Sequence, residues 1–435
     1  MDPQPANRHP IWIILFTILI DSLGIGILVP IVPQLFGNPA SPHYLFSGRE
    51  SVGTGYVLLG FLVAVFPIMQ FFSTPVLGQL SDRYGRKKIL AISLAGTALG
   101  YALFAVGVIL RAIPLLFVAR ALDGITGGNL SVAQAAIADV TAPKDRTKTF
   151  GLVGAVFGIG FILGPFFGGV LGDPSIVSWF DAATPFWFAA VLATLNTVSV
   201  VTQFHETNRH IRHVPVQLGR SLHNIARAYA LPALRPIFVT IFFFNAGFGF
   251  FISFFSVFLI DRFGYNQTQI GNFFAYVGLC MIFTQLVTTR RVAARFAERE
   301  VLRVSLLGVS MMMGSYLLTP SARWIFLIAP FSSTFNGLTM ANMGGLLSRS
   351  VAPEVQGEVL GIGSSIQALA QALPPLGAGF VAASLTPKAP VLAASCTMFL
   401  AWAAFTTLYR PVHVAATPAA GLGHQPAKAL QIEGG

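Results

Sequence analysis

Long apolar runs constrain the fold of this chain more than any other feature. A helix needs roughly 20 mainly apolar residues to cross a bilayer. The runs that meet this length lie at 11–35, 54–77, 89–110, 113–139, 149–172, 183–203, 236–260, 268–289, 301–319, 323–348, 358–383 and 390–409. The sequence therefore predicts an all-α membrane protein with twelve transmembrane helices.

The spacing of the runs divides the chain into four parts. We expect a six-helix bundle over 1–203 and a second six-helix bundle over 236–410. Between them, 204–235 contains arginine among histidine and asparagine, which predicts a basic cytoplasmic linker with a short surface helix. Residues 411–435 lack an apolar run, so we expect a flexible cytoplasmic tail there.

The distribution of charge supports a membrane protein over a nucleic-acid-binding one. Only 10% of the residues are charged, whereas a soluble domain carries about 25%. The net charge is +11, but the Lys and Arg residues gather in the N-terminus, the even-numbered loops and the C-terminus. This positive-inside bias places both termini in the cytoplasm. We expect a multi-pass protein of a plasma or bacterial inner membrane, with no nucleic-acid partner.

The residues that build cofactor and metal sites are poorly placed for such roles. Cys280 and Cys396 both lie within apolar runs, and all eight histidines lie outside them. No intramembrane zinc or haem site follows from this pattern. The sequence also lacks the phosphate-binding motif of ATPases. We therefore predict no metal, no cofactor and no enzymatic activity.

An internal repeat relates the two halves. The segment from Val140 resembles the segment from Ser350 at an offset of 210 residues. Glycine and proline match in register at Pro143/Pro353, Gly151/Gly361, Pro165/Pro375 and Gly169/Gly379. Two six-helix pseudo-repeats of this kind place a substrate site near the membrane midplane, exposed to each side in turn as the halves rock.

The segment "GQLSDRYGRKKIL" joins the second and third predicted helices. Asp82 stands among Arg83 and Arg86, while Gly78 and Gly85 permit a tight turn. One interpretation is a positive-inside turn with no further role. The acid favours a second interpretation, in which these residues form a positioned salt-bridge and helix-cap cluster.

Asp21 lies about ten residues into the first helix, roughly 15 Å deep at 1.5 Å per residue. A carboxylate exposed to lipid there costs ~3 kcal/mol or more, so it faces a wet cavity or a partner. Arg120, deep in the fourth run, is the candidate partner. Asp123 stands three residues on, close enough to pair with Arg120 on one helix face. The residues leave two alternatives open, a static Arg120–Asp123 pair and a pair that exchanges partners with Asp21.

Several motifs resemble a known family. "GQLSDRYGRKK" resembles the G-x-L-x-D-R-x-G-R-[RK] motif of the major facilitator superfamily, and "GIGFILGPFFGGV" resembles the G-P-x-x-G-G motif of its drug/proton antiporters. "ARALDGITGGNLSVAQAAIADVT" and "LIDSLGIGILVPIVPQLF" are similar to the tetracycline-efflux branch. The second of these motifs lies in the fifth predicted helix, 149–172, and we call it the helix-5 motif. Its residues are Gly160, Gly164, Pro165, Gly168 and Gly169.

The resemblance implies a major-facilitator fold and a role for Asp21, Arg120 and Asp123 in proton coupling. It also implies a monomeric secondary transporter that exports an amphipathic or drug-like molecule in exchange for protons. The alternatives are a proton-coupled symporter or facilitator of a metabolite and a non-transporting receptor or interaction protein. The candidate residues of the substrate cavity are Asn245, Asn336, Gln367 and Gln371.

The chain departs from the tetracycline-efflux pattern at three places. Gly100 stands where that branch has an acid, and 301–319 has no acid inside the helix. Asp123 stands where the family carries a small residue. The first two departures count against a metal–tetracycline substrate, and the third marks either a second proton site or a neutralised Arg120.

The segment between the second and third helices also predicts a gate. Asp82, Arg86 and Asp139 fall on one side of the membrane and form a cytoplasmic latch in this hypothesis. The repeat places the beginning of the eleventh helix, near Glu358 to Gly361, opposite them. Its N-terminus carries about half a positive charge, which attracts Asp82.

Overall fold

The computed structural model describes residues 9–46, 52–141, 146–208, 217, 219–351 and 353–410. The predicted tail at 411–435 and residues 209–216 and 218 of the predicted linker lie outside this part of the chain. Every regular element in the described residues is helical, so the prediction of an all-α fold is confirmed.

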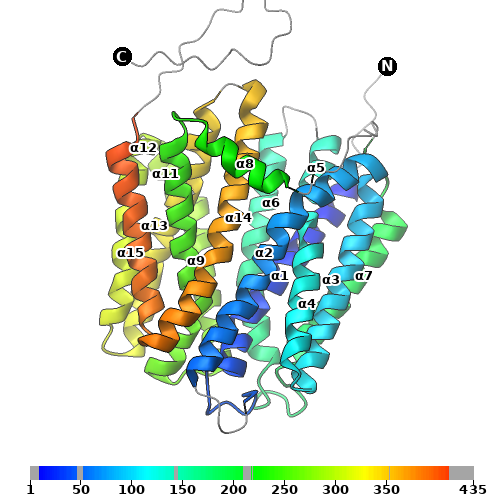
Figure 1. Ribbon diagram of the computed structural model, residues 1–435, viewed down its shortest axis with the longest axis vertical. Helices are drawn as coiled ribbons and strands as arrows, with labels where there is room; N and C mark the ends of the chain where they lie inside the picture. Colours follow the sequence, from blue (N-terminus) through cyan, green and yellow to red (C-terminus); the bar gives the residue numbers. More distant parts are fainter. Residues whose placement is uncertain are drawn as a thin grey trace, which may run out of the picture.

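The helices of the first half follow one another with short connections. The elements, in chain order, are α1 (His9–Phe36), α2 (Val52–Tyr84), α3 (Arg86–Ile109), α4 (Ile113–Thr126), η1 (Gly127–Asn129), α5 (Leu130–Val140), α6 (Arg146–Leu171) and α7 (Thr184–Gln203). They stand side by side in Figure 1.

The second half begins with a short helix that lies across the bundle. The elements are α8 (Arg220–Tyr229), α9 (Arg235–Phe263), α10 (Gln267–Phe283), the π-helical segment η3 (Thr284–Thr288), α11 (Thr289–Ala293), α12 (Glu298–Ser315), η4 (Tyr316–Leu318), α13 (Ala322–Arg349), α14 (Pro353–Ser384) and α15 (Ala389–Leu408). Figure 1 shows α8 at the upper end of the molecule, which we call the linker end; the other is the opposite end.

Ten helices within the described residues are long and apolar enough to span a membrane. The predicted spans at 113–139 and 323–348 are not among the ten. The first is divided into two short helices, and the second is a single helix, α13, rich in hydroxyl and amide side chains. The arrangement is consistent with twelve membrane crossings, in which α4, η1 and α5 together form one of them.

The prediction of one continuous helix over 113–139 is wrong, because the 3-10 turn η1 interrupts it. Glycines bring this segment against α2: a Cβ on Gly124 or Gly128 would lie within 3.0 Å of α2 atoms. Side chains of α2 also bind carbonyl oxygens of the segment, since Gln70 donates to Gly127 at 2.9 Å and Ser73 donates to Gly124 at 3.1 Å. These contacts stabilise the turn in place of regular helical hydrogen bonds.

The tight turn predicted around Gly78 and Gly85 is smaller than expected. Helix α2 continues through Gly78 to Tyr84, and α3 begins at Arg86, so Gly85 alone breaks the helix. Gly85 has a φ of 95°, which favours glycine. Gly78 instead faces Ser131 of α5, whose Oγ lies 3.6 Å from the position of a Cβ.

The two halves meet through backbone contacts at the opposite end. In one crossing, Gly271 of α10 lies against the Pro165 carbonyl of α6, and a Cβ on Gly271 would be 3.1 Å from the Cα of Gly169. A side chain at either glycine would separate the helices. The predicted helix-5 motif therefore includes a contact between the halves.

A second crossing has the same geometry. Gly60 of α2 lies against the Pro375 carbonyl of α14, and a Cβ on Gly60 would be 3.1 Å from the Cα of Gly379. Pro375 and Gly379 are the repeat partners of Pro165 and Gly169. The repeat found in the sequence thus corresponds to two equivalent helix crossings.

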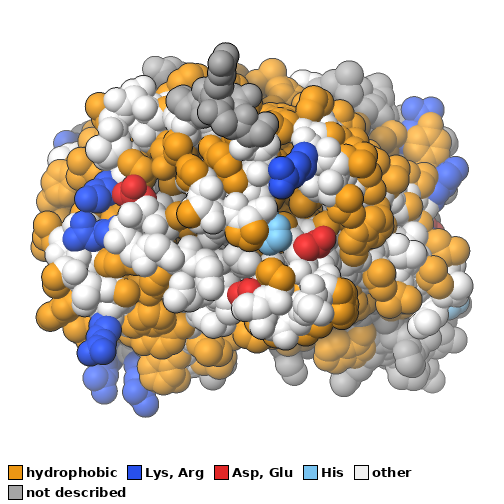
Figure 2. All heavy atoms as spheres, turned by 90° about the horizontal axis from the view of Figure 1, so that it is seen from below, with side chains coloured by type: hydrophobic (Ala, Val, Ile, Leu, Met, Phe, Trp, Pro, Cys, Tyr) orange, Lys and Arg blue, Asp and Glu red, His pale blue; other side chains and the backbone are white. Residues whose placement is uncertain are grey.

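Hydrogen bonds reinforce the contact at the opposite end. Gln34 of α1 donates to the Tyr265 carbonyl oxygen at 3.0 Å, and Gln267 of α10 donates to the Gly172 carbonyl oxygen at 3.0 Å. Figure 2 shows this face from below, where acidic side chains and a histidine gather near the centre among apolar and uncharged groups. The halves are closed against each other there.

The linker end is more open along α6 and α14. A Cβ added at Gly154 or Gly158 of α6, or at Gly361 of α14, would meet no atom within 4 Å. The same helices make backbone contacts at the opposite end. Gly154, Gly158 and Gly361 therefore take part in no close helix crossing.

Asp173, just after α6, provides a pH test of the contact between the halves. Its carboxylate accepts hydrogen bonds from Thr268 of α10 at 2.5 Å and from the Ser175 hydroxyl at 2.7 Å. Burial opposes ionisation of Asp173, but these hydrogen bonds outweigh it and lower the pKa below the ordinary 3.8. A lowered folded-state pKa adds stability that is present above the ordinary pKa and is lost as the pH falls through the folded value.

We predict that Asp173→Asn lowers the Tm at pH 6 and that the difference from the parent protein shrinks below about pH 4. Thermal unfolding of the parent protein and of Asp173→Asn between these pH values measures the difference in Tm. Asp261→Asn, an exposed change near the same end, is the control and should change the Tm little. A difference for Asp173→Asn that stays constant with pH would contradict the assignment.

Candidate functional site: a buried charge cluster

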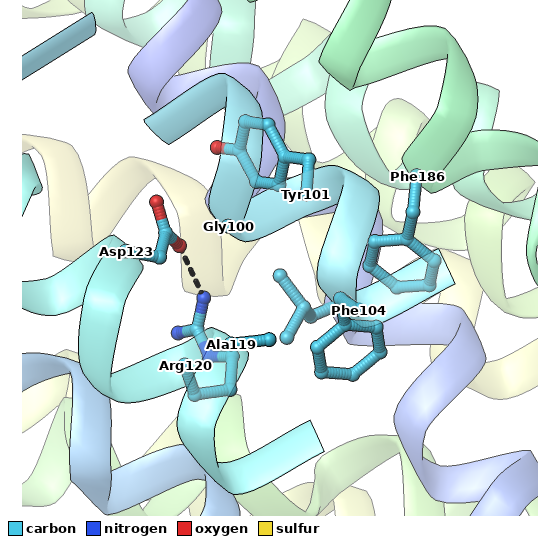
Figure 3. Close-up of a pocket in the computed structure, with 8 residues that line it drawn as sticks. Gly100, Tyr101, Phe104, Ala119, Arg120, Asp123 and Phe186 are labelled. Carbon is cyan, nitrogen blue, oxygen red and sulfur yellow. Dashed lines mark hydrogen bonds and ion pairs between the residues drawn. The ribbon is translucent and has the colours of Figure 1, made fainter. Parts of the chain in front are cut away.

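The central feature of the candidate site is an ion pair within α4. Arg120 Nη1 lies 2.7 Å from Asp123 Oδ2, and the two side chains are 6% and 5% exposed. Helical geometry accounts for the pairing, because residues three apart share one face. Figure 3 shows the pair beside a narrow gap, whose lining residues are Leu28, Gly100, Tyr101, Phe104, Ala119, Arg120, Asp123 and Phe186.

Arg120 is also held by an aromatic ring. Its Cζ lies 4.5 Å from the ring centroid of Phe66 in α2, a cation–π contact. Its Nε is buried and has no hydrogen-bond partner. Arg120 thus retains at least one buried donor without a partner at the centre of the first half.

Asp21 stands next to this ion pair. Its Oδ2 is buried and has no hydrogen-bond partner. Asp123 and the side chain of Asn129 are its close polar neighbours. Asn129 belongs to η1, is fully buried, and both of its amide atoms lack partners. The break in the fourth span therefore places the Asn129 amide beside the Asp21 carboxyl group.

Tyr101 of α3 closes the other side of the cluster. Its hydroxyl lies against Gly24 of α1, where a Cβ would overlap the phenol oxygen. Tyr101 interacts electrostatically with Asp123, Asp21 and Arg120. Four elements, α1, α3, α4 and η1, thus converge on one polar site.

The cluster is suited to binding one proton. Two ionised carboxylates and one guanidinium leave a net charge of −1, and one added proton makes the cluster neutral. A buried site of low dielectric favours the neutral state. Because arginine keeps its proton, only the two carboxyl groups can bind or release one.

The predicted gating residues come together at the linker end. Arg86 Nη2 lies 2.7 Å from Asp82, and its Nε lies 3.2 Å from Asp139 of α5. The Asp82 side chain is 47% exposed and that of Arg86 only 10%. Arg83 extends over the ring of its neighbour Tyr84, 5.3 Å from its centroid. The described contacts of this group are with the first half and with residues 206–208 of the linker.

Glu206, beyond α7, completes the group. It accepts hydrogen bonds from the backbone N–H groups of Arg86 at 2.9 Å and Lys87 at 3.1 Å. These N–H groups belong to the first turn of α3, which has no side-chain cap of its own. The segment after α7 therefore fixes the position of the charged turn.

The helix-5 motif lies on α6, the fifth membrane crossing, and most of it packs on α1. Cβ atoms at Gly160, Gly164 or Gly168 would lie within 3.0 Å of α1 atoms, and Pro165 faces Gly26 of that helix. Gly169 faces α10, as described above. The motif residues therefore hold α6 between α1 and α10.

The four predicted cavity residues do not form one cluster through hydrogen bonds. Asn245 donates to the Ile241 carbonyl oxygen of its own helix at 2.8 Å. Asn336 is buried, and its Oδ1 has no partner. Gln367 is exposed and Gln371 half-buried on α14. A direct role in substrate contact stays a prediction for all four.

Known proteins show which family shares this architecture. The family model described as Major Facilitator Superfamily matches residues 14–375, with a second match over 237–432. The chain belongs to the major facilitator superfamily.

Relatives within the superfamily include efflux proteins. The class H tetracycline resistance protein of Pasteurella multocida is 32% identical over 388 residues, which cover 86% of this chain and 89% of the relative. Multidrug resistance protein 1 of Bacillus subtilis is 27% identical, covering 75% and 78%. The human organic anion transporter MFSD10 has a TM-score of 0.68 at 23% identity, covering 92% of this chain and 100% of that structure.

Three residues of the site, Asn129, Glu206 and Tyr101, escaped the sequence-based prediction. Asn129 had a usable signal, because "TGGN" combines helix-breaking glycines with an amide inside an apolar run. Glu206 had none, because it caps a helix that begins 120 residues earlier in the chain. Tyr101 is one aromatic residue among many in its run, and only its place beside Gly24 distinguishes it.

The Arg120–Asp123 pair gives a stability prediction. Asp123→Asn leaves the buried guanidinium without its 2.7 Å partner. Removing one member of a buried ion pair costs about 3–5 kcal/mol, and Asp21 offsets part of this loss. We expect a clear fall in Tm, whereas Asp82→Asn, a matched change at a half-exposed pair, costs about 0–1 kcal/mol.

The pH profile of transport separates the two alternatives for this pair. A static pair leaves the midpoint of the profile unchanged in Asp123→Asn. A shifted midpoint would show that Asp123 itself takes up and releases a proton.

Proposed function

We propose that this chain is a monomeric secondary transporter that exports an amphipathic or drug-like molecule in exchange for protons. The likeness to tetracycline resistance proteins over most of the chain supports export. The half-buried Asp21, whose Oδ2 is buried without a hydrogen-bond partner next to Asp123, is the single observation that carries proton coupling.

Coupling follows from charge balance in the cluster. With Asp21 ionised, the cluster carries a net negative charge and is stabilised by water or by a cationic partner. With Asp21 protonated, the cluster is neutral and tolerates a closed, dry environment. Rocking of the halves changes the access of water to Asp21, so each cycle takes up a proton from one side and releases it to the other.

The substrate class follows from the departures from the tetracycline-efflux pattern. Gly100 lines the gap beside Arg120 and brings no carboxylate, and its Cβ position is 3.2 Å from the Cβ of Asp123. A metal–substrate chelate gains from extra carboxylates, whereas an apolar organic molecule does not. We therefore favour an apolar or amphipathic organic substrate.

The membrane placement follows the same proposal. The linker end, which includes α8, is cytoplasmic, and the membrane is a plasma or bacterial inner membrane. Opening of that end gives the cytoplasm-facing state that receives substrate.

The proposal predicts the behaviour of Asp21→Asn in liposomes containing a pH-sensitive dye. The variant should fold and bind substrate, because asparagine preserves the size of the side chain, but it should lose uphill export and coupled proton movement. Drug-like compounds are screened first with the parent protein. Intact proton-driven export in Asp21→Asn would exclude Asp21 as the carrier, and uptake in the direction of the proton gradient would indicate a symporter.

We also propose that Asp82, Arg86 and Asp139 form a latch that favours closure of the linker end. Helix α14 begins at Pro353, earlier than the expected start near Glu358, and its N-terminus attracts the half-exposed Asp82 when the halves approach. A contact of about 1 kcal/mol shifts the ratio of the two states several-fold.

Asp82→Asn should therefore slow turnover, leave substrate affinity nearly unchanged and widen the linker end. Spin labels at Val201 of α7 and Leu408 of α15, both exposed, report the distance between the halves. Glu300→Gln, a charge loss in the second half, is the control. Unchanged distances with normal turnover would reduce this segment to an orientation signal.

A further inference from the structure

Helix α8 has three distinct faces. Ser221 and Ala228 are buried, with Asn224 and Ile225 half-buried between them, and this face packs on the bundle. Arg220, His223 and Arg227 are all exposed. Their spacing of three and four residues places them on one stripe of the helix.

The third face is apolar and also exposed. Leu222 is 56% exposed, and Ala226 is exposed one turn later. At 100° per residue, this stripe and the basic stripe lie about 120° apart on either side of the packed face. A helix in water gains nothing by exposing leucine, whereas a helix at a membrane surface places such a face among the lipid chains and its cations among the headgroups.

The packed face ties the two halves together at the linker end. Ser221 Oγ donates to the Phe71 carbonyl oxygen of α2 at 2.6 Å. Pro75, four residues after Phe71, has no N–H, so this carbonyl lacks its usual helical donor. On the other side, Asn224 Nδ2 donates to Ser365 Oγ of α14 at 3.1 Å.

A second link precedes the helix. The Gln217 backbone N–H donates to Gln79 Oε1 of α2 at 2.8 Å, and Gln79 Nε2 lies 3.4 Å from the Gln217 carbonyl oxygen. Figure 1 shows α8 crossing the bundle at its linker end, over α14 and towards α2. The helix is therefore held at a fixed depth, with its basic and apolar stripes facing outward.

We propose that α8 binds anionic phospholipid headgroups through Arg220 and Arg227, with Leu222 and Ala226 lying at the level of the acyl chains. Charge complementarity selects the lipid, because the exposed stripe is cationic, and the adjoining apolar stripe requires a bilayer rather than a soluble anion. Because the same helix joins α2 to α14, bound lipid acts on the junction that changes when the linker end opens or closes.

The test uses the full chain in liposomes, with a fluorophore on Ala226→Cys in a Cys280→Ala/Cys396→Ala background. The bilayers contain phosphatidylcholine and phosphatidylglycerol in equal parts, with bromine on the acyl chains of one lipid or the other as a quencher. A basic residue near an anionic surface contributes about 1 kcal/mol to binding, which raises the local ratio of phosphatidylglycerol to phosphatidylcholine about fivefold. We expect quenching by brominated phosphatidylglycerol to exceed quenching by brominated phosphatidylcholine several-fold.

Two pairs of substitutions identify which residues cause the stronger quenching by brominated phosphatidylglycerol. Arg220→Gln/Arg227→Gln should bring the quenching ratio close to one. Arg323→Gln/Lys388→Gln, which removes two exposed charges at the opposite end, should keep the ratio of the parent. Raising the salt from about 0.1 to 1 M shortens the Debye length from about 10 to 3 Å, so it should lower the ratio without any substitution.

Three results would overturn the proposal. Equal quenching by both lipids in the parent would mean that the helix lies on the membrane without selecting anionic headgroups. No quenching by either lipid would mean that α8 does not contact the bilayer. A preference that persists in Arg220→Gln/Arg227→Gln at low salt would assign lipid binding to other residues.

Discussion

The arrangement of the two halves depends on a backbone contact that occurs twice. In each crossing a glycine, Gly271 or Gly60, lies against the carbonyl of a proline and the Cα of a glycine on the facing helix. Neither crossing has room for a side chain, so the axes approach more closely than ordinary helix pairs. Such a contact involves few side-chain rotamers, and its separation therefore leaves few groups to rearrange. In the proposed transport cycle, these crossings would be a compact pivot for rocking of one half against the other.

The ion pairs lie within each half and do not join the two halves. The ion pairs of Arg86 and Arg120 stay within the first half, and the pair of Arg349 with Glu298 stays within the second. Contacts between the halves are glycine crossings, apolar packing such as that of Tyr56 on Phe254, and hydrogen bonds. Each hydrogen bond is worth about 0.5–1.5 kcal/mol net. The halves can separate without leaving a buried charge alone. Two states separated by a few kcal/mol are what alternating access requires.

Much of the fold was predictable because membranes limit the available structures to a few. Hydropathy located most of the long helices, and the repeat at Pro165/Pro375 corresponds to two equivalent helix crossings. The predictions failed where tertiary contacts replace local hydrogen bonds. The break at η1 depends on Gln70 and Ser73 of another helix, and the extension of α2 to Tyr84 continues a helix beyond its apolar residues. Hydropathy does not record either effect.

The charge cluster shows why a site is harder to predict than a fold. Asp21, Arg120 and Asp123 were identifiable one by one, because a charge at membrane depth is costly and needs a reason. Their arrangement was not, because it depends on a helix break that places Asn129 beside Asp21. That break also separates the site from the gating residues: Arg120 and Asp123 lie on α4, whereas Asp139 lies on α5. A change of angle at Gly127 and Gly128 would move Asp139, and with it Arg86, relative to the charge cluster. Under the proposed function, the interrupted helix would connect protonation of the cluster to closure of the linker end, which a continuous helix would transmit only as a rigid body.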